Sequence, residues 1–387
     1  MFRDSGYATM AIGKWHMCRE QDMHAAGNRH SWPLQRGFDQ FYGFLEAQAN
    51  LHAPAQLYEG NSPVHTVEYP DGYYLTDDLV DRAVAMIAEA HASDPSTPLM
   101  MYFAHAAVHA PMHVKPGAAD GFRGRYDCGW DEIRTARRQR QGELGLIPAD
   151  AGTGPLSDNG ASGGGGGDIG VLNHLANLNR THNPTTEQRI DEEIGRIDEI
   201  GGPTTWPQYS TAWATVSNTP FRRHKFSTYR GGHQVSFLMS WPAGLGAKGV
   251  LRHQYAHVTD VLPTIAELSG VPIAAGRNGL PAGPIDGTSM VAALRDPDAP
   301  SSHGDQYYEC LGERAYYAGE WEAVAQRVPL TEFSADRWAL YDTASDPVQL
   351  SDVSASHPDQ VDELVQRWDD AALHNQVYPM ANGSPLH

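Results

Sequence analysis

Polar side chains that could bind a ligand follow the apolar runs of this sequence. Lys14 and His16 come directly after the run of residues 7–12, and three histidines follow the run of residues 99–104. In open α/β sheets, ligands bind beyond the carboxyl ends of the strands. If both runs are strands, these side chains lie where such a fold binds its ligand. The plain alternative is a solvated loop lysine beside a histidine that caps a turn.

Two further clusters carry donor groups of different kinds. Asp158 and Asn159 stand side by side in an Asp-Asn-Gly turn, and their hard oxygens suit a divalent cation. The basic run of residues 222–225 ends in Lys225 and precedes a third apolar run at 235–241. Asp-Asn-Gly is also a common turn without any ligand, and a basic run is commonly a solvated face.

The histidines at 105, 109 and 113 have a spacing of four residues, which would align them on one helix face as zinc ligands. Pro111 argues against a continuous helix, because proline removes a backbone donor and clashes one turn back. The segment is therefore predicted to be a loop. Its one functional histidine is expected to be His109, in the His-Ala-Pro turn.

A helical pattern separates the first two apolar runs. Leu79, Ala83 and Ile87 recur every four residues after Thr76, which predicts a helix. Strand, helix and strand in alternation indicate an α/β fold with a mostly parallel central sheet flanked by helices. Further along the chain, the pattern predicts a helix over 186–200, a strand over 235–241 and a helix over 258–268.

The amino-acid composition and its pattern change near the C-terminal end of the sequence. From about residue 305, short aromatic-rich runs separated by turns predict a small antiparallel sheet. Pro358 opens a last helix that carries Trp368 on its apolar face. A linker-like stretch, PDAPSSHGD, divides the chain into an α/β core of residues 1–300 and a C-terminal α+β subdomain of residues 301–387.

Composition excludes several classes of protein. The 387 residues carry 28 basic and 47 acidic side chains, a formal charge of −19, which argues against a general nucleic-acid binder. No apolar stretch reaches the roughly 18 residues that a membrane span needs. Three widely spaced cysteines predict no disulfide framework. If Met1 is the true start, the lack of a targeting segment predicts a cytoplasmic protein; otherwise the compartment stays open, as does the oligomeric state.

Several motifs together resemble the sulfatases, a family of the alkaline-phosphatase-like superfamily. GYATMAIGKWH, HAPMH, SDNGAS, SNTPFRRHK with YRGG, and SWPAGL stand in the family's order. The C-terminal segments PIDGTSM, QYYECLGERA and WALYDTASDP look like the arylsulfatase C-terminal region. The resemblance covers nearly the whole chain and implies the alkaline-phosphatase-like α/β fold.

The resemblance also implies roles for four residues. Lys14 and His16 would contact the sulfate, and His109 would contact the ester or protonate the leaving oxygen. Lys225 would bridge the sulfate and the leaving oxygen. Ammonium groups suit this chemistry, because the transition state of a sulfate ester spreads negative charge over oxygen atoms.

The resemblance implies two cofactors, a divalent cation and a formylglycine, and this sequence contains only part of the residues that the family uses for them. Asp158 and Asn159 would bind a divalent cation, usually calcium, with magnesium as the alternative. The family's formylglycine nucleophile is made from a C/S-x-P-x-R motif, which this sequence does not contain; the nearest imitation, Ser31 to Arg36, has its arginine one place late. The expectation is a chain that lacks the family's N-terminal segment and an internal block before Asp158. Arg230 also departs from the family pattern, which often has an acidic residue there.

The predicted function is hydrolysis of a small sulfate ester, arylsulfatase-like, in a form without its nucleophile. Two alternatives stay open. A phosphonate or phosphodiester hydrolase of the same superfamily would share the fold, the cation and the lysines. A non-catalytic protein of this fold that binds an anion or a partner would explain the missing nucleophile directly.

Overall fold

The computed structural model describes residues 1–66, 68–148, 191, 194–245, 249–277, 279–328 and 330–380. The chain divides into two compact units. The first comprises Met1–Arg123, Asp168–Gln208 and Val271–Asn278, and the second comprises Gly124–Gly167, Tyr209–Gly270 and Gly279–His387. These units group the residues differently from the division into 1–300 and 301–387, which stays a prediction.

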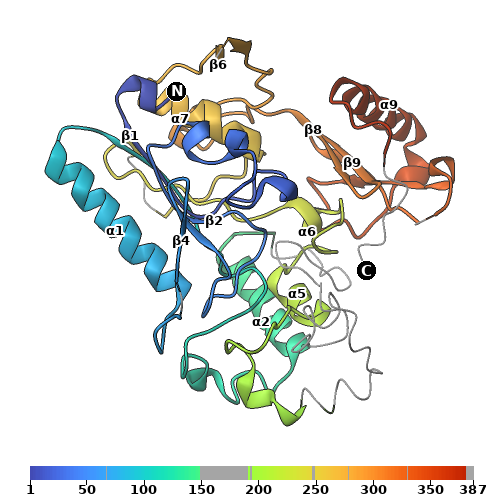
Figure 1. The fold of residues 1–387 in the computed structure, drawn as a ribbon. Coiled ribbons are helices and arrows are strands. Elements are labelled where there is room, and N and C mark those ends of the chain that lie inside the picture. The colour runs from blue at the N-terminus through green and yellow to red at the C-terminus, as the bar shows by residue number, and fades with distance from the viewer. Residues whose placement is uncertain are drawn as a thin grey trace. The chain divides into compact units, whose positions relative to one another are not determined.

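A five-stranded mixed sheet forms the core of the first unit (Figure 1). Its order is β4-β3-β2-β1-β5, with β1 parallel to β2 and β5, and with β3 antiparallel to β2 and β4. The strands are β1 (Ala8–Lys14), β2 (Gln40–Phe44), β3 (Leu57–Glu59), β4 (Ser62–Val64) and β5 (Leu99–Ala104). The first two apolar runs are thus the parallel strands that the sequence predicted, and the α/β class is confirmed. The antiparallel β3 and β4 make the sheet mixed rather than mostly parallel.

Helix α1 (Leu75–Ser93) lies along one face of this sheet, as Figure 1 shows. Its buried residues Leu75, Leu79, Ala83 and Met86 pack in one cluster with residues of β1 and β2. The helix predicted after Thr76 is confirmed. The fourth buried position is Met86 rather than Ile87, which is 41% exposed, because 3.6 residues per turn bring position 86 back under the buried stripe.

The remaining elements of the first unit are short. They are η1 (Arg3–Ser5), η2 (Glu20–Asp22), η3 (Arg29–Ser31), η4 (Leu34–Arg36), η5 (Asp120–Phe122), η6 (Ile197–Glu199) and β6 (Gly276–Arg277). Across the described part of the chain, no helix combines the length and the apolar character that crossing a bilayer would take.

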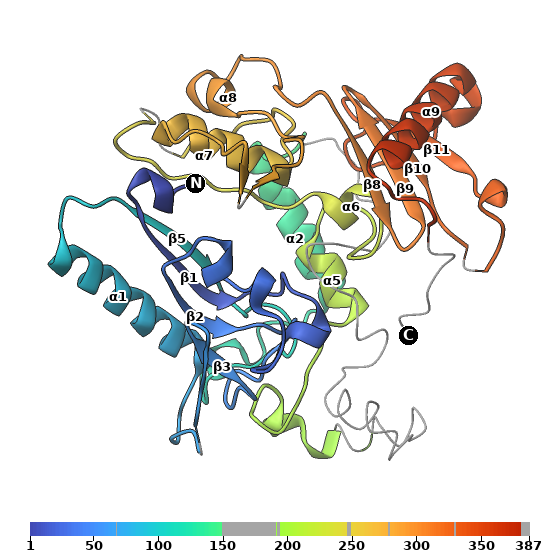
Figure 2. The same ribbon diagram turned by 45° about the horizontal axis from the view of Figure 1, so that its top comes forward.

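A four-stranded antiparallel sheet forms the C-terminal part of the second unit, in the order β11-β10-β9-β8 (Figure 2). Its strands are β8 (Asp305–Cys310), β9 (Glu313–Ala318), β10 (Trp321–Ala325) and β11 (Trp338–Asp342). Helix α9 (Pro358–His374) packs on the sheet through Leu364, Trp368 and Ala372, all fully buried. The small antiparallel sheet and the closing helix are confirmed, with Pro358 in the first helical turn as predicted.

The second unit also contains several helices outside this sheet. They are α2 (Trp130–Glu143), α5 (Thr211–Ser217), α6 (Arg230–His233), η7 (Val258–Asp260), α7 (Val261–Ser269), α8 (Val291–Arg295), η8 (Phe333–Ala335) and η9 (Ser354–Ser356), with the two-residue strand β7 (Leu280–Pro281). The helix predicted over 258–268 corresponds to η7 and α7 and is confirmed.

Two predicted elements need correction or lie largely outside the described residues. Residues 235–241 form no strand and have no regular secondary structure, and Val235, Phe237 and Leu238 are 66%, 57% and 87% exposed. An apolar run becomes a buried strand only where neighbouring strands cover it, and no described strand pairs with this one. Of the helix predicted over 186–200, residues 186–190, 192 and 193 lie outside the described residues. Residues 191, 194 and 195 are helical and the segment ends in the short η6, with Ile194 and Ile197 64% and 61% exposed.

Candidate functional site

The first predicted site residues lie at the carboxyl end of β1. Lys14 is the last residue of the strand and stands opposite Phe44 of β2. Pairing continues for two residues beyond it, because the Trp15 amide donates to the Phe44 carbonyl at 2.9 Å and the His16 amide donates to the Leu45 carbonyl at 3.1 Å. The backbone that carries both Lys14 and His16 is therefore fixed by the neighbouring strand.

Trp15 anchors this segment in the core of the first unit. Its side chain is 6% exposed, and its indole Nε1 donates to the Ser31 carbonyl at 2.7 Å. Its ring makes edge contacts with Phe38 and Tyr102, with centroids 5.9 and 6.2 Å away. Lys14, on one side of this anchor, is half-buried, and His16, on the other, is exposed with a left-handed backbone (φ +46°).

The predicted histidine loop leaves the sheet at the same edge. Strands β1 and β5 are parallel and pair as far as Gly13 and Ala104, so the loop begins beside Lys14. The His109 amide donates to the Ala106 carbonyl at 3.0 Å, which closes a turn, and the half-buried His109 ring has its Nδ1 2.9 Å from the Ala110 carbonyl. Three of the predicted residues thus lie at or just after the ends of two adjacent parallel strands: Lys14 at the end of β1, His16 just after it, and His109 in the loop after β5.

His113 has a structural role. Its Nδ1 accepts a hydrogen bond from the Leu51 amide at 3.1 Å, so the ring proton is on Nε2, which donates to the Thr205 carbonyl at 2.8 Å. The ring is 4% exposed, and burial lowers its pKa. Residues 105–113 contain no helix, as Pro111 predicted, and the described residues contain no group of three or more His, Cys, Asp or Glu side chains that could hold a metal ion.

Sequence reasoning missed Glu46, which stands two residues beyond β2 at this edge of the sheet. One of its carboxylate oxygens accepts a hydrogen bond from the Leu45 amide at 3.0 Å, and burial raises its pKa. Glu46 is not part of a recognisable motif. The only signal in the sequence was its place just after an apolar run.

Lys225 belongs to the second unit, in the loop that joins α5 to α6. Its ammonium lies 5.6 Å from the centre of the Phe226 ring, and its charge opposes the raised pKa that burial gives the Cys310 thiol. Three residues further on, Thr228 ties the loop to strand β9. The Thr228 amide donates to Glu313 Oε2 at 3.2 Å, and its hydroxyl donates to the Arg314 carbonyl at 3.1 Å.

The two arginines before Lys225 do not form the solvated face that was the plain alternative. Arg222 donates to the Gln349 carbonyl at 2.7 Å and stacks over the Tyr229 ring at 4.5 Å. Arg223 donates to Gln326 Oε1 at 2.9 Å. Both side chains hold the loop against the C-terminal sheet.

Arg230, the departure noted in the sequence, has a buried partner of opposite charge. Its Nε donates to Glu322 Oε2 at 3.0 Å, and Glu322 is fully buried in β10. His233 Nε2 lies 3.1 Å from the other oxygen of the same carboxylate. Burial, with Arg230 and His257 nearby, lowers the pKa of His233 to about 3, so this ring is neutral.

Asp158 and Asn159, the predicted cation ligands, lie outside the described residues. Lys14, His16 and His109 belong to the first unit and Lys225 to the second. That these four side chains meet around one ligand therefore stays a prediction.

Comparison with known proteins identifies relatives along nearly the whole chain. Residues 1–147 match the Sulfatase family. An uncharacterized sulfatase of Schizosaccharomyces pombe is 23% identical over 447 aligned positions, which cover 95% of this chain and 75% of that protein. An arylsulfatase of Klebsiella aerogenes is 23% identical, covering 75% of this chain and 71% of that one. The crystal structure of Ps i-CgsB superposes on 98% of this chain and 75% of that one, with a TM-score of 0.57 at 18% identity, which bears on the fold alone.

Proposed function

Because this chain is related to the sulfatases through residues 1–147, we propose that it binds sulfate esters and that aryl sulfates are its substrate class. The observation that carries the proposal is the paired segment at the end of β1. There the buried Trp15 and two interstrand hydrogen bonds hold Lys14 and His16 on a rigid backbone. A rigid support favours anion recognition, because the cationic groups need little reorganisation when the ligand binds.

In this proposal, each of four side chains makes a different contact with the sulfate ester. Lys14 and His16 contact the non-bridging oxygens of the sulfate. Lys225 contacts both the sulfate and the ester oxygen, on which negative charge would grow if the S–O bond were broken. His109 donates a hydrogen bond to that oxygen; cleavage of the S–O bond would also need a nucleophile, which these four side chains do not supply. Ammonium and imidazole groups stabilise such charge best where water is excluded.

A divalent cation would neutralise part of the sulfate charge when bound. Asp158 and Asn159 supply hard oxygens, which suit calcium, with magnesium as the alternative. Calcium takes roughly six to eight oxygen ligands. Two protein ligands leave most of these positions to water, so the donor set fits a weakly held cation.

The nucleophile is where this chain departs from the family. No C/S-x-P-x-R motif occurs in its sequence, and Cys18, Cys128 and Cys310 all lack the following proline and arginine. These residues do not fit a formylglycine, so no step of the proposal passes through one. The same observation favours a second candidate function, an anion-binding protein of this fold without catalysis.

Ligand selectivity tests the proposed substrate class. In calorimetric titrations, 4-nitrophenyl sulfate is expected to bind more tightly than phenylphosphonate or bis(4-nitrophenyl) phosphate at equal ionic strength. A preference for either phosphorus compound would favour the phosphonate or phosphodiester alternative. No heat of binding with any of the three would contradict the proposal.

A further inference from the structure

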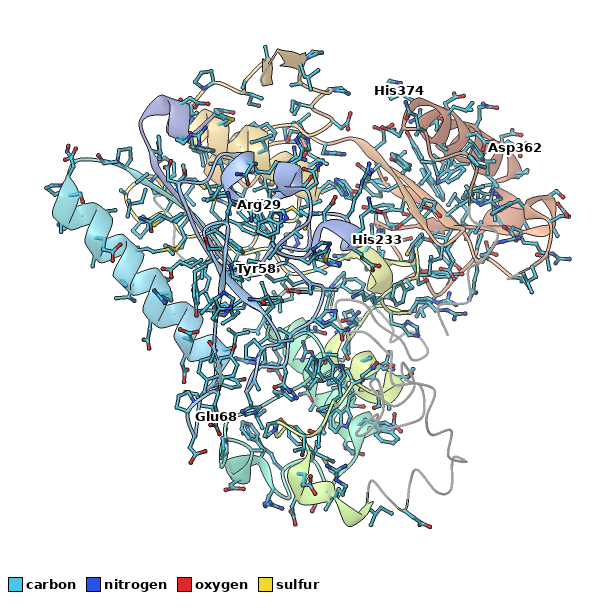
Figure 3. The ribbon with its side chains drawn as sticks, viewed as in Figure 1. Arg29, Tyr58, Glu68, His233, Asp362 and His374 are labelled. Carbon is cyan, nitrogen blue, oxygen red and sulfur yellow. The ribbon has the colours of Figure 1, made fainter. Side chains whose placement is uncertain are left out.

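The carboxylate of Glu322 faces both ends of the short helix α6. Oε2 accepts a hydrogen bond from Arg230 Nε, at the first residue of α6. Oε1 lies 3.1 Å from His233 Nε2, at the last residue of α6, without forming a hydrogen bond. His233 is labelled in Figure 3 at the end of α6. Glu322 is fully buried, and Arg230 and His233 have side chains 14% exposed. Since a buried carboxylate is costly without a partner, the ion pair between Arg230 and Glu322 fixes the start of α6 on strand β10.

Holding α6 also holds the loop that carries Lys225, because the loop closes on itself. The Gly231 amide donates to the Arg222 carbonyl at 3.1 Å, so residues on both sides of Lys225 are joined by a backbone hydrogen bond. Asn218 Nδ2 donates to the Gly231 carbonyl at 2.8 Å. A Cβ atom on Gly231 would lie 2.3 Å from the Arg222 oxygen, which shows how closely the two ends of the loop approach.

A second attachment comes from a different part of the same unit. The Arg230 amide donates to Gln349 Oε1 at 2.8 Å, and the Gln349 carbonyl accepts from Arg222 at 2.7 Å. Gln349 is fully buried. Together with the Thr228 contacts to β9, these bonds leave the loop little freedom relative to the C-terminal sheet.

We propose that Glu322 is a positioning residue for Lys225: by pairing with Arg230 at the first residue of α6 it fixes the closed loop 222–231, and so the direction in which the Lys225 ammonium points. This inference rests on the proposed function for the role of Lys225. It assigns to the C-terminal sheet a part in ligand binding through a residue that does not touch the ligand. The ion pair with Arg230 requires the charge of Glu322, because neutral glutamine has the same shape but cannot form that ion pair.

A matched control variant distinguishes an effect on the position of Lys225 from a general loss of protein stability. Asp336 has a side chain 1% exposed and pairs with Arg314 at 2.7 Å and Arg327 at 2.8 Å. It is therefore a second buried carboxylate ion pair of the same unit, and none of the contacts just described involves its side chain. Asp336→Asn and Glu322→Gln remove comparable buried charges, and both are expected to lower the melting temperature.

The experiment measures binding of 4-nitrophenyl sulfate to the full chain by calorimetry, at a temperature where every variant is folded. Glu322→Gln is expected to weaken binding about tenfold when Lys225 is present and not at all in a Lys225→Ala background, as for two groups that act through one contact. Asp336→Asn is expected to leave the affinity unchanged. Equal losses in both backgrounds, or an unchanged affinity in Glu322→Gln, would overturn the inference.

A second readout is independent of sulfate binding. The rate of acetylation of Lys225 by acetic anhydride, followed by mass spectrometry, reports how its amine is held. Glu322→Gln is expected to change this rate by roughly threefold or more, since coupled neighbours interact by an appreciable free energy, whereas Asp336→Asn leaves it as in the parent. If the parent binds no aryl sulfate, the proposed function fails while this measurement still decides the positioning role; an unchanged rate in Glu322→Gln would refute it.

Discussion

Gly13 of β1 packs so closely against Ala104 of β5 that a Cβ atom on residue 13 would lie 1.9 Å from the Ala104 carbonyl oxygen. Gly13 also has a φ of +93°, a conformation that favours glycine. Lys14 follows directly, so this close approach of two strands fixes the backbone just before Lys14.

Replacing Gly13 with alanine is expected to destabilise the protein by more than ~3 kcal/mol, because the clash and the backbone strain add. Gly6→Ala is the matched control: Gly6 has a φ of +86°, but a Cβ atom there would meet nothing within 4 Å. Strain alone predicts a cost of about 1 kcal/mol at that position. Urea unfolding measures both. Equal losses in the two variants would show that the strand contact is looser than described.

Stability is expected to fall in mild acid, partly because of His113. Burial lowers its pKa in the folded protein, so the unfolded chain binds the proton more readily. The contribution of His113 is fully present above its ordinary pKa of about 6.5 and is lost as the pH falls below that value. The loss of unfolding free energy between pH 7.5 and pH 5 should be smaller in His113→Gln than in the parent. His91→Gln, an exposed change on α1, should keep the parent's loss; the same loss in all three proteins would contradict the assignment.

The extent to which the sequence predicts this fold depends on how local each signal is. Strands β1 and β5 and helix α1 follow from runs and periodicities within about twenty residues. The run at 235–241 has the same composition as a strand, yet whether an apolar run is covered depends on neighbours that its own residues do not specify.

The residues of the candidate site likewise differ in whether the local sequence identifies them. Lys14, His16, His109 and Lys225 stand in motifs, from which the sequence predicts them as site residues. Glu322 could not, because its partner Arg230 lies 92 positions away and a lone glutamate in a strand carries no signal. The sequence marked Arg230 only as a departure, and the buried carboxylate opposite it gives the physical reason why a cation is stable there.

Calcium is expected to bind weakly, with a Kd well above micromolar, since Asp158 and Asn159 alone supply few of the roughly six to eight oxygens that the ion takes. Calorimetric titration of the chelator-treated protein measures this, and Asp158→Ala should abolish what binding there is. Sub-micromolar affinity would contradict the expectation that further protein ligands are lacking.

Turnover of 4-nitrophenyl sulfate is expected at or near background, even with calcium and a formylglycine-generating enzyme supplied. The positioned lysines and histidines polarise the ester, but losing a nucleophile typically costs several orders of magnitude. Release of 4-nitrophenol, compared between the parent and Lys225→Ala, measures this. Robust hydrolysis that the variant loses would reveal a nucleophile that these residues do not account for.

Lys14 and Lys225 are expected to contact the same sulfate ester, and a comparison of the parent with Lys14→Ala, Lys225→Ala and Lys115→Ala tests this most directly. Lys115 is the matched control, a lysine of the first unit that pairs with Asp77 on α1 and has a half-exposed side chain. Calorimetry with 4-nitrophenyl sulfate should show affinity reduced at least about tenfold in Lys14→Ala and in Lys225→Ala, as expected for the loss of a charged contact, and unchanged in Lys115→Ala. Parent-like affinity in either of the first two variants would contradict the account.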